Sequence, residues 1–149
     1  MVDAIDVIAE RASTQALTIA CAESLTSGAI AAALGRGEDA ASWFAGGVVA
    51  YSSAVKFDVL AVDEGPVVCA SCAQQMAEGV RRLLAADAAV AVTGVGGPGE
   101  EEGEPAGTVY VATCVQGKSE VTHHRFDGDP AEVVEQTVRE ALDRLAERL

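Results

Sequence analysis

The chain has 149 residues, 50% of them hydrophobic, and this length suits one globular domain with a sizeable core rather than two full domains. Its formal net charge is −13, with 10 Lys and Arg against 23 Asp and Glu, which excludes the basic surface that nucleic-acid binding requires. No apolar run reaches the roughly 18 residues of a membrane span, and the first ten residues carry acids where a signal peptide carries bases. We therefore expect a single cytoplasmic domain over residues 1–149, with no membrane or nucleic-acid partner.

The first half of the chain alternates between helical and extended patterns. Residues 2–12 carry apolar side chains at helical spacing, which predicts an amphipathic helix. The run ALTIAC at 16–21 predicts a buried strand, and residues 26–35 predict a helix that ends at Gly35. Residues 46–57 contain a second strand with a polar exit.

The second half continues the alternation and then adds a hairpin. The pattern predicts a helix over 71–86 and an apolar strand over 88–93, followed by a loop rich in Gly, Pro and Glu. Strands at 108–115 and 120–126 flank the turn signal QGKS. A final helix is predicted from an N-terminal capping pattern, which consists of Asp129, Pro130 and Glu132. These elements predict a layered α/β sheet in which the hairpin makes at least one strand antiparallel.

Ser24 stands where the first strand turns into the second helix. A serine at this point lies beside unpaired N–H groups and the positive end of the helix dipole, which together stabilise a developing oxyanion. Serine is also a preferred helix cap, so an ordinary turn serine is the competing interpretation. The choice between the two depends on whether the chain supplies a base.

Lys56 is the candidate base. The two histidines, His123 and His124, are adjacent in a predicted strand and therefore point to opposite faces. Lys118 falls in the exposed hairpin turn, whereas Lys56 follows an apolar stretch that has no acid before Asp58. A buried amine without a carboxylate partner loses its charge readily, although a lysine that extends to solvent from a strand end explains the pattern as well.

Two further features support a site. Tyr51 and Ser52 precede Lys56 closely and supply hydroxyls that relay protons or orient a substrate. The segment TGVGGPG at 93–99 has glycines that permit close ligand approach or form an anion-binding nest. It is neither a dinucleotide fingerprint nor a P-loop, because it has no matching acid, helix or lysine.

The cysteines allow a different chemistry. Cys69 and Cys72 form a C-x-x-C pair at a predicted helix start, where a thiol pKa is lowered, and with Cys21 and Cys114 they offer four thiolates for zinc. A single C-x-x-C is a weak metal signal, and Cys21 and Cys114 fall in predicted buried strands. We favour four reduced thiols and expect no metal site.

Five segments taken together, AESLTSG, WFAGGVVAYSSAVK, MAEGVRRLLAAD, AVTGVGGPG and GTVYVA, resemble the CinA carboxy-terminal domain family, the nicotinamide-mononucleotide amidases. The resemblance covers nearly the whole chain in the same order. It implies an α/β fold, a three-layer α/β/α sandwich with a mixed, mostly parallel sheet. It also implies a homodimer that deamidates the small-molecule nucleotide nicotinamide mononucleotide to nicotinic acid mononucleotide and ammonia in pyridine-nucleotide salvage, without a cofactor.

The resemblance also assigns roles to residues. Ser24 matches the nucleophile and Lys56 the general base, with Tyr51 beside them in the catalytic group. We expect acyl transfer, in which N–H groups around Thr26–Gly28 hold the oxyanion and water releases the acyl group. The predicted substrate-binding residues are Thr26, Ser27, Gly28, Ser52, Thr93, Gly94, Gly96 and Gly97.

The chain departs from the family pattern at positions that bear on the substrate. Ser27 replaces a glycine, and Glu104, Pro130 and Val134 stand where the family tends to have basic residues, next to glutamates at 100–102. Each such glutamate near a phosphate costs about 1 kcal/mol or less in water. Two other hypotheses therefore stay open: a catalytically impaired nucleotide-binding or regulatory module of the same fold, and a Ser-Lys hydrolase of another amide or ester.

Overall fold

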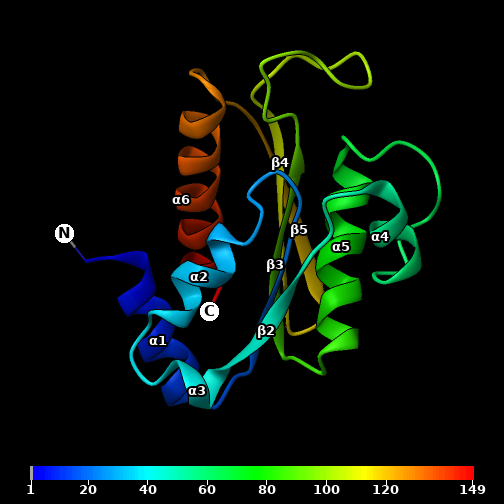
Figure 1. Cartoon of the computed structure of the whole chain (residues 1–149). Helices are drawn as coiled ribbons and strands as arrows, with labels where there is room; N and C mark the ends of the chain where they lie inside the picture. Colours follow the sequence, from blue (N-terminus) through cyan, green and yellow to red (C-terminus); the bar gives the residue numbers. More distant parts are fainter. Residues whose placement is uncertain (1) are drawn as a thin grey trace.

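The structure is a computed structural model that describes residues 2–149, and its centre is a five-stranded sheet with the strand order β2-β1-β3-β4-β5 (Figure 1). β1 pairs in parallel with β2 and β3, while β4 is antiparallel to both β3 and β5. Four of the five strands therefore point the same way, which confirms the predicted mixed, mostly parallel sheet. The strands are β1 (Ile19–Glu23), β2 (Phe44–Val49), β3 (Ala88–Gly94), β4 (Thr108–Val115) and β5 (Lys118–Arg125).

Helices cover both faces of this sheet and complete the predicted three layers. Helices α1, α2, α3 and α6 lie on one face, and α4 and α5 lie on the other (Figure 1). Within residues 2–149, no helix combines the length and the apolar character needed to cross a membrane. The helices are α1 (Ala4–Gln15), α2 (Ala29–Gly35), α3 (Ala40–Trp43), α4 (Ser53–Asp58), α5 (Ala70–Leu83) and α6 (Pro130–Arg148).

The two faces of the sheet have different side chains. Successive strand residues point to opposite faces, so Ile19 and Val90 pack towards α1 and α6, while Ala20 and Ala91 face α5. The bulky face supports several helices, and the alanine face lets α5 pack closely against the backbone of the sheet. β1 contributes side chains to the core on both faces of the sheet. This packing fixes the position of the turn that follows β1.

The sequence predicted the start of the last helix and the last hairpin turn correctly, because both contain characteristic capping or turn residues. Asp129 and Glu132 form a reciprocal capping box at the start of α6, with N-to-oxygen distances of 2.9 and 3.1 Å. The β4–β5 turn has two residues, Gln116 and Gly117, with φ of 52° and 77°, the conformation of a tight hairpin turn.

Two short helices were not predicted from the sequence. α3 and α4 have four and six residues, too few to show a helical period. The expectation that Lys56 lies at the exit of a strand is wrong, because β2 ends at Val49 and Lys56 lies within α4. The hydroxyl of Ser52 caps this helix by accepting the N–H of Val55 at 3.4 Å.

A glycine in α5 provides a first test of the packing. A Cβ added to Gly79 would lie 2.0 Å from the carbonyl oxygen of Leu60, whereas a Cβ on Gly35 in α2 would meet nothing within 4 Å. We expect Gly79→Ala to lower the free energy of unfolding by about 2 kcal/mol through overpacking, and Gly35→Ala to raise it by about 0.5 kcal/mol through helix propensity. Urea unfolding of both variants checks this; equal effects would contradict the close packing at Gly79.

Candidate active site

Ser24 lies at the carboxyl end of β1, in a tight turn that leads into α2. Ser24 is buried, with 8% of its surface exposed, and its carbonyl accepts the N–H of Ser27 at 3.1 Å. The turn is completed by Ser27 and Gly28, with φ of 52° and 104°. Ser27 therefore adopts a left-handed conformation that favours glycine, at a cost of about 1 kcal/mol. Its side chain is exposed.

Glu23, which precedes Ser24, is a fully buried carboxylate that the sequence analysis missed. One oxygen, Oε1, accepts the hydroxyl of Thr26 at 2.6 Å and the N–H of Ile30 at 2.8 Å. The other, Oε2, accepts the N–H of Ala31 at 2.9 Å. A carboxylate at the N-terminus of a helix is stabilised by the unpaired N–H groups and the dipole. Glu23 therefore fixes the turn that carries Ser24 against the start of α2.

We expect Glu23→Ala to lower the free energy of unfolding by about 3 kcal/mol, because the hydroxyl of Thr26 and the N–H groups of Ile30 and Ala31 lose their acceptor. Chemical denaturation measures the loss. The matched control is Glu10→Ala, which removes an exposed glutamate of α1 and should change stability by less than about 0.5 kcal/mol. Similar losses in the two variants would mean that Glu23 does not hold the turn.

The hydrogen bonds of Glu23 also refine where an oxyanion could bind. The N–H groups of Ile30 and Ala31 are taken by Glu23, and that of Ser27 is taken by Ser24. Within the predicted segment Thr26–Gly28, the N–H groups of Thr26 and Gly28 have no acceptor among the described residues. The N–H of Leu25 likewise has no acceptor there, so three donors of this turn remain for a ligand near Ser24.

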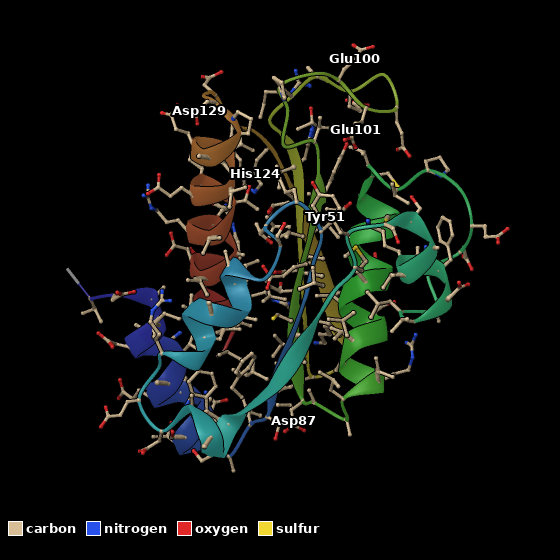
Figure 2. The ribbon with its side chains drawn as sticks, in the orientation of Figure 1. Tyr51, Asp87, Glu100, Glu101, His124 and Asp129 are labelled. Carbon is tan, nitrogen blue, oxygen red and sulfur yellow. The ribbon has the colours of Figure 1, made fainter. Side chains whose placement is uncertain are left out.

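A pocket of about 170 Å³ opens over Ser24. Ser24, Tyr51 and Gly94 reach it from the carboxyl ends of β1, β2 and β3, which run in parallel. Ligands of open α/β sheets bind at this edge. Figure 2 shows Tyr51 below the glutamate-rich loop, with Glu101 between them. The lining residues are Ser24, Leu25, Tyr51, Gly94, Gly96, Gly97, Glu101, Pro130 and Val134.

This pocket brings together part of the predicted site and leaves out the rest. Six predicted residues do not line it, namely Lys56, Thr26, Ser27, Gly28, Ser52 and Thr93. Their polar groups mostly serve the fold: the hydroxyl of Thr93 donates to the carbonyl of Val67 at 2.8 Å, for example. A larger pocket of about 480 Å³ lies between α2 and α6, but it shares only Val134 with the pocket over Ser24 and contains no candidate nucleophile.

Lys56 is buried, with 2% of its surface exposed, so it does not extend to solvent as the competing interpretation held. Its Nζ donates to the carbonyl oxygens of Ala50 at 2.8 Å and Tyr51 at 3.3 Å. A charged ammonium has three N–H donors, whereas a neutral amine has two and a lone pair. The two carbonyls therefore satisfy both N–H groups of a neutral amine, or two of the three N–H groups of an ammonium.

Burial lowers the pKa of Lys56 from its ordinary value of 10.5, because a charged amine is poorly solvated there. Negative charge on Cys72, Glu101 and Glu102 acts in the opposite direction. Burial also raises the pKa of Cys72 to about 11, so its thiol is neutral near pH 7 and exerts no such charge. Glu101 and Glu102 in the loop are therefore the charges that act to raise the pKa of Lys56.

Lys56 and Ser24 are linked through the backbone. The carbonyl of Ala50 accepts from Lys56, and the N–H of Ala50 donates to the carbonyl of Glu23 at 2.7 Å, one residue before Ser24. Lys56 and Ser24 make no direct hydrogen bond in this structure. Catalytic hydrogen bonds are often long in the absence of substrate and shorten when it binds.

The remaining ionisable candidates lie away from the pocket. His123 stacks on Tyr110 with ring centroids 4.6 Å apart, and His124 Nε2 lies 3.6 Å from Glu140 on α6. These contacts confirm that the two histidines point to opposite faces of the sheet. Each histidine contacts another side chain, whereas buried Lys56 is joined to the turn at Ser24 through the carbonyl of Ala50, which makes Lys56 the base candidate.

The cysteines give no support to redox or metal chemistry. All four are free thiols, and Cys69 caps α5 without a side-chain hydrogen bond to the helix. The pKa of Cys72 is raised, contrary to the expectation that the helix start would lower it. Across residues 2–149, no three His, Cys, Asp or Glu side chains group closely enough to hold a metal ion.

Fold and site together define a three-layer α/β/α fold with a buried serine at the carboxyl end of β1 and a buried lysine in α4. The chain belongs to the CinA C-terminal domain family, whose model matches residues 3–149. It is 42% identical over 119 residues to a competence-damage inducible protein of Listeria welshimeri, a match that covers 76% of this chain and 29% of that protein. A protein of the same name from Lacticaseibacillus casei is 42% identical over 128 residues, covering 82% and 31%. The chain thus spans less than a third of the length of these curated relatives.

Solved structures of the same superfamily have the same fold. A competence-damaged protein (CinA) superfamily protein from Klebsiella pneumoniae matches with a TM-score of 0.92 and 37% identity, covering 97% of this chain and 94% of that one. Another from Escherichia coli matches with a TM-score of 0.94 and 33% identity, covering 98% and 88%.

Proposed function

We propose that the protein is an amidase that deamidates nicotinamide mononucleotide to nicotinic acid mononucleotide and ammonia through a Ser24 acyl-enzyme. The observation that carries the proposal is the pairing of a buried serine at a strand end with a buried lysine that contacts backbone carbonyls and forms no salt bridge among the described residues. An unprotonated lysine is a base for a serine nucleophile. The nucleotide substrate rests on the family resemblance.

The reaction then proceeds in two steps, acylation of Ser24 and hydrolysis of the acyl-enzyme. The amine of Lys56 accepts the proton of the Ser24 hydroxyl, whose oxygen bonds to the carboxamide carbon, and the carbonyl oxygen takes up the negative charge. The unpaired N–H groups of the turn, those of Leu25, Thr26 and Gly28, are the donors available to stabilise this oxyanion. The C–N bond breaks as Lys56 returns its proton to the leaving nitrogen, which departs as ammonia. Water, deprotonated by Lys56, then splits the ester and regenerates Ser24.

The hydrogen bonds of Lys56 tie its amine to a segment beside the site, and this segment carries the amine towards Ser24 in the proposed mechanism. Both carbonyl acceptors, at Ala50 and Tyr51, belong to the segment that joins β2 to α4 and lines one side of the site. Closure of this segment on a substrate brings the amine towards Ser24 directly or through one water molecule. The exposed ring of Tyr51, 68% accessible, is in place to cover a substrate in the pocket.

The experiment that tests the proposal incubates the purified protein with nicotinamide mononucleotide and measures ammonia and nicotinic acid mononucleotide separately. The amidase produces the two products in equal amounts, in proportion to protein concentration. Release of free nicotinamide instead would indicate cleavage of the glycosidic bond and contradict the proposal. No product of either kind from a folded protein would also contradict it.

The acidic pocket favours a second candidate, a nucleotide-binding module that keeps the fold and has lost turnover. Glu101 lines the pocket, and the lining contains no Arg, Lys or His to bind a phosphate. Saturable binding of nicotinamide mononucleotide without ammonia release would support this candidate, and turnover would exclude it.

A further inference from the structure

Glu101 is the charged residue among those that line the pocket over Ser24. In Figure 2 its side chain lies on the inner side of the loop, between the loop and Tyr51, whereas the side chain of the neighbouring Glu100 lies on the outer side. Glu101 takes part in no salt bridge among the described residues. The pocket therefore presents a carboxylate that forms no ion pair with a cation of the described residues.

The loop holds Glu101 in this position. The backbone N–H of Glu101 donates to the carbonyl of Glu104 at 3.1 Å, and the N–H of Glu104 donates back at 2.8 Å. The next residue, Glu102, uses its carboxylate to accept the N–H groups of Val67 and Val68, at distances of 2.8 to 3.1 Å. These contacts anchor the loop at Glu101 and at the residues that follow it, and they hold Glu101 at the pocket wall.

The volume of the pocket decides which part of a substrate meets Glu101. At about 170 Å³ it is smaller than the roughly 300 Å³ of a drug-sized ligand site. The carboxamide and the group that carries it fill the pocket, and the rest of a nucleotide extends outside. Glu101 therefore faces the group that is attached directly to the reacting carboxamide.

We propose that Glu101 selects amides in which the carboxamide is carried by a positively charged group, such as a pyridinium ring. This inference rests on the proposed amidase function and assigns a residue of the same site the role of determining specificity. A carboxylate attracts a nearby cation and repels an anion, and at an exposed site the effect is moderate and is reduced by salt. The influence of Glu101 on the pKa of Lys56 shows that its charge reaches the catalytic group.

The test compares two small amides of nearly the same shape, 1-methylnicotinamide, which is a cation, and nicotinamide, which is neutral. Binding is measured by NMR titration in the Ser24→Ala protein, so that turnover does not interfere. We expect the cation to bind about threefold more tightly than the neutral amide. This preference should be lost in Glu101→Gln, and it should become smaller when salt is added to about 1 M. Glu100→Gln, one residue away on the outer side of the loop, is the matched control and should keep the preference.

Equal affinity for the two amides, a preference that survives Glu101→Gln, or no binding of either amide would overturn the inference. Ammonia release from nicotinamide mononucleotide by the unmodified protein is scored separately. Turnover without a charge preference would refute the role of Glu101 and leave the amidase function standing. A charge preference that depends on Glu101, without turnover, supports its role and refutes the amidase.

Discussion

Lys56→Met should lower kcat for ammonia release by about a thousandfold or more, because it removes the amine that acts as the base in the proposed reaction. The substitution keeps most of the length of the buried side chain and removes the lone pair that accepts the proton of Ser24. It also removes the donor to the carbonyls of Ala50 and Tyr51, so the folded state of the variant is checked by circular dichroism. Steady-state kinetics with nicotinamide mononucleotide measures the loss.

The chain provides its own control for Lys56, since Lys118 is its one other lysine. Lys118 is exposed at the start of β5, and Lys118→Met should leave kcat within about twofold of the parent value. If Lys56→Met, correctly folded, retained most of the activity, Lys56 would not be the base. Equal losses in the two variants would point to a general effect of lysine replacement.

The same lysine predicts the pH dependence of the reaction. The base must be neutral to accept a proton, so kcat/KM should rise with pH as Lys56 deprotonates and fall away below its pKa. Burial places this rise below the ordinary value of 10.5. A rise centred at 10.5 or above would contradict a buried base.

Ser24→Ala should abolish ammonia release, with a loss of at least about a thousandfold, because it removes the atom that forms the acyl-enzyme. The fold should survive, since the carboxylate of Glu23 holds the turn and the hydroxyl of Ser24 makes no hydrogen bond to another described residue. The assay is ammonia release at saturating substrate, with unfolding by urea as the check on stability.

The control for Ser24 is Ser13→Ala, which removes a serine from the exposed side of α1. It should retain the full rate. Activity of Ser24→Ala within tenfold of the parent would mean that water attacks the amide directly and that the serine has a supporting role.

The fold was largely predictable because its strongest signals are local. The buried strands, the capping box at Asp129 and the two-residue hairpin turn each follow from a few neighbouring residues. The short helix α4 was missed for the opposite reason: one cap, Ser52, starts it, and no periodic stretch marks it. The order of the strands depends on contacts between distant segments and could not be predicted from these patterns. The expectation of one domain over residues 1–149 stays a prediction.

The candidate site was predictable in its residue types and less so in its geometry. Ser24 was identified from its position between a strand and a helix, and Lys56 from its apolar surroundings, and both are buried. Glu23 was overlooked because a glutamate at a strand end normally faces water, and only the tertiary structure shows that α2 supplies its donors. Glu101 was noted for its charge, but whether it faced the pocket depended on how the loop folds back on residues 67 and 68.

The central claim is that Ser24 carries the acyl group of the substrate, and hydroxylamine tests it most directly. Hydroxylamine competes with water for an acyl-enzyme, so turnover of nicotinamide mononucleotide in its presence should yield the hydroxamate of the nucleotide beside the acid. We predict that the hydroxamate fraction rises with hydroxylamine concentration and that Ser24→Ala forms neither product. Formation of the acid alone at every hydroxylamine concentration, with Ser24→Ala still releasing ammonia, would contradict the acyl-enzyme.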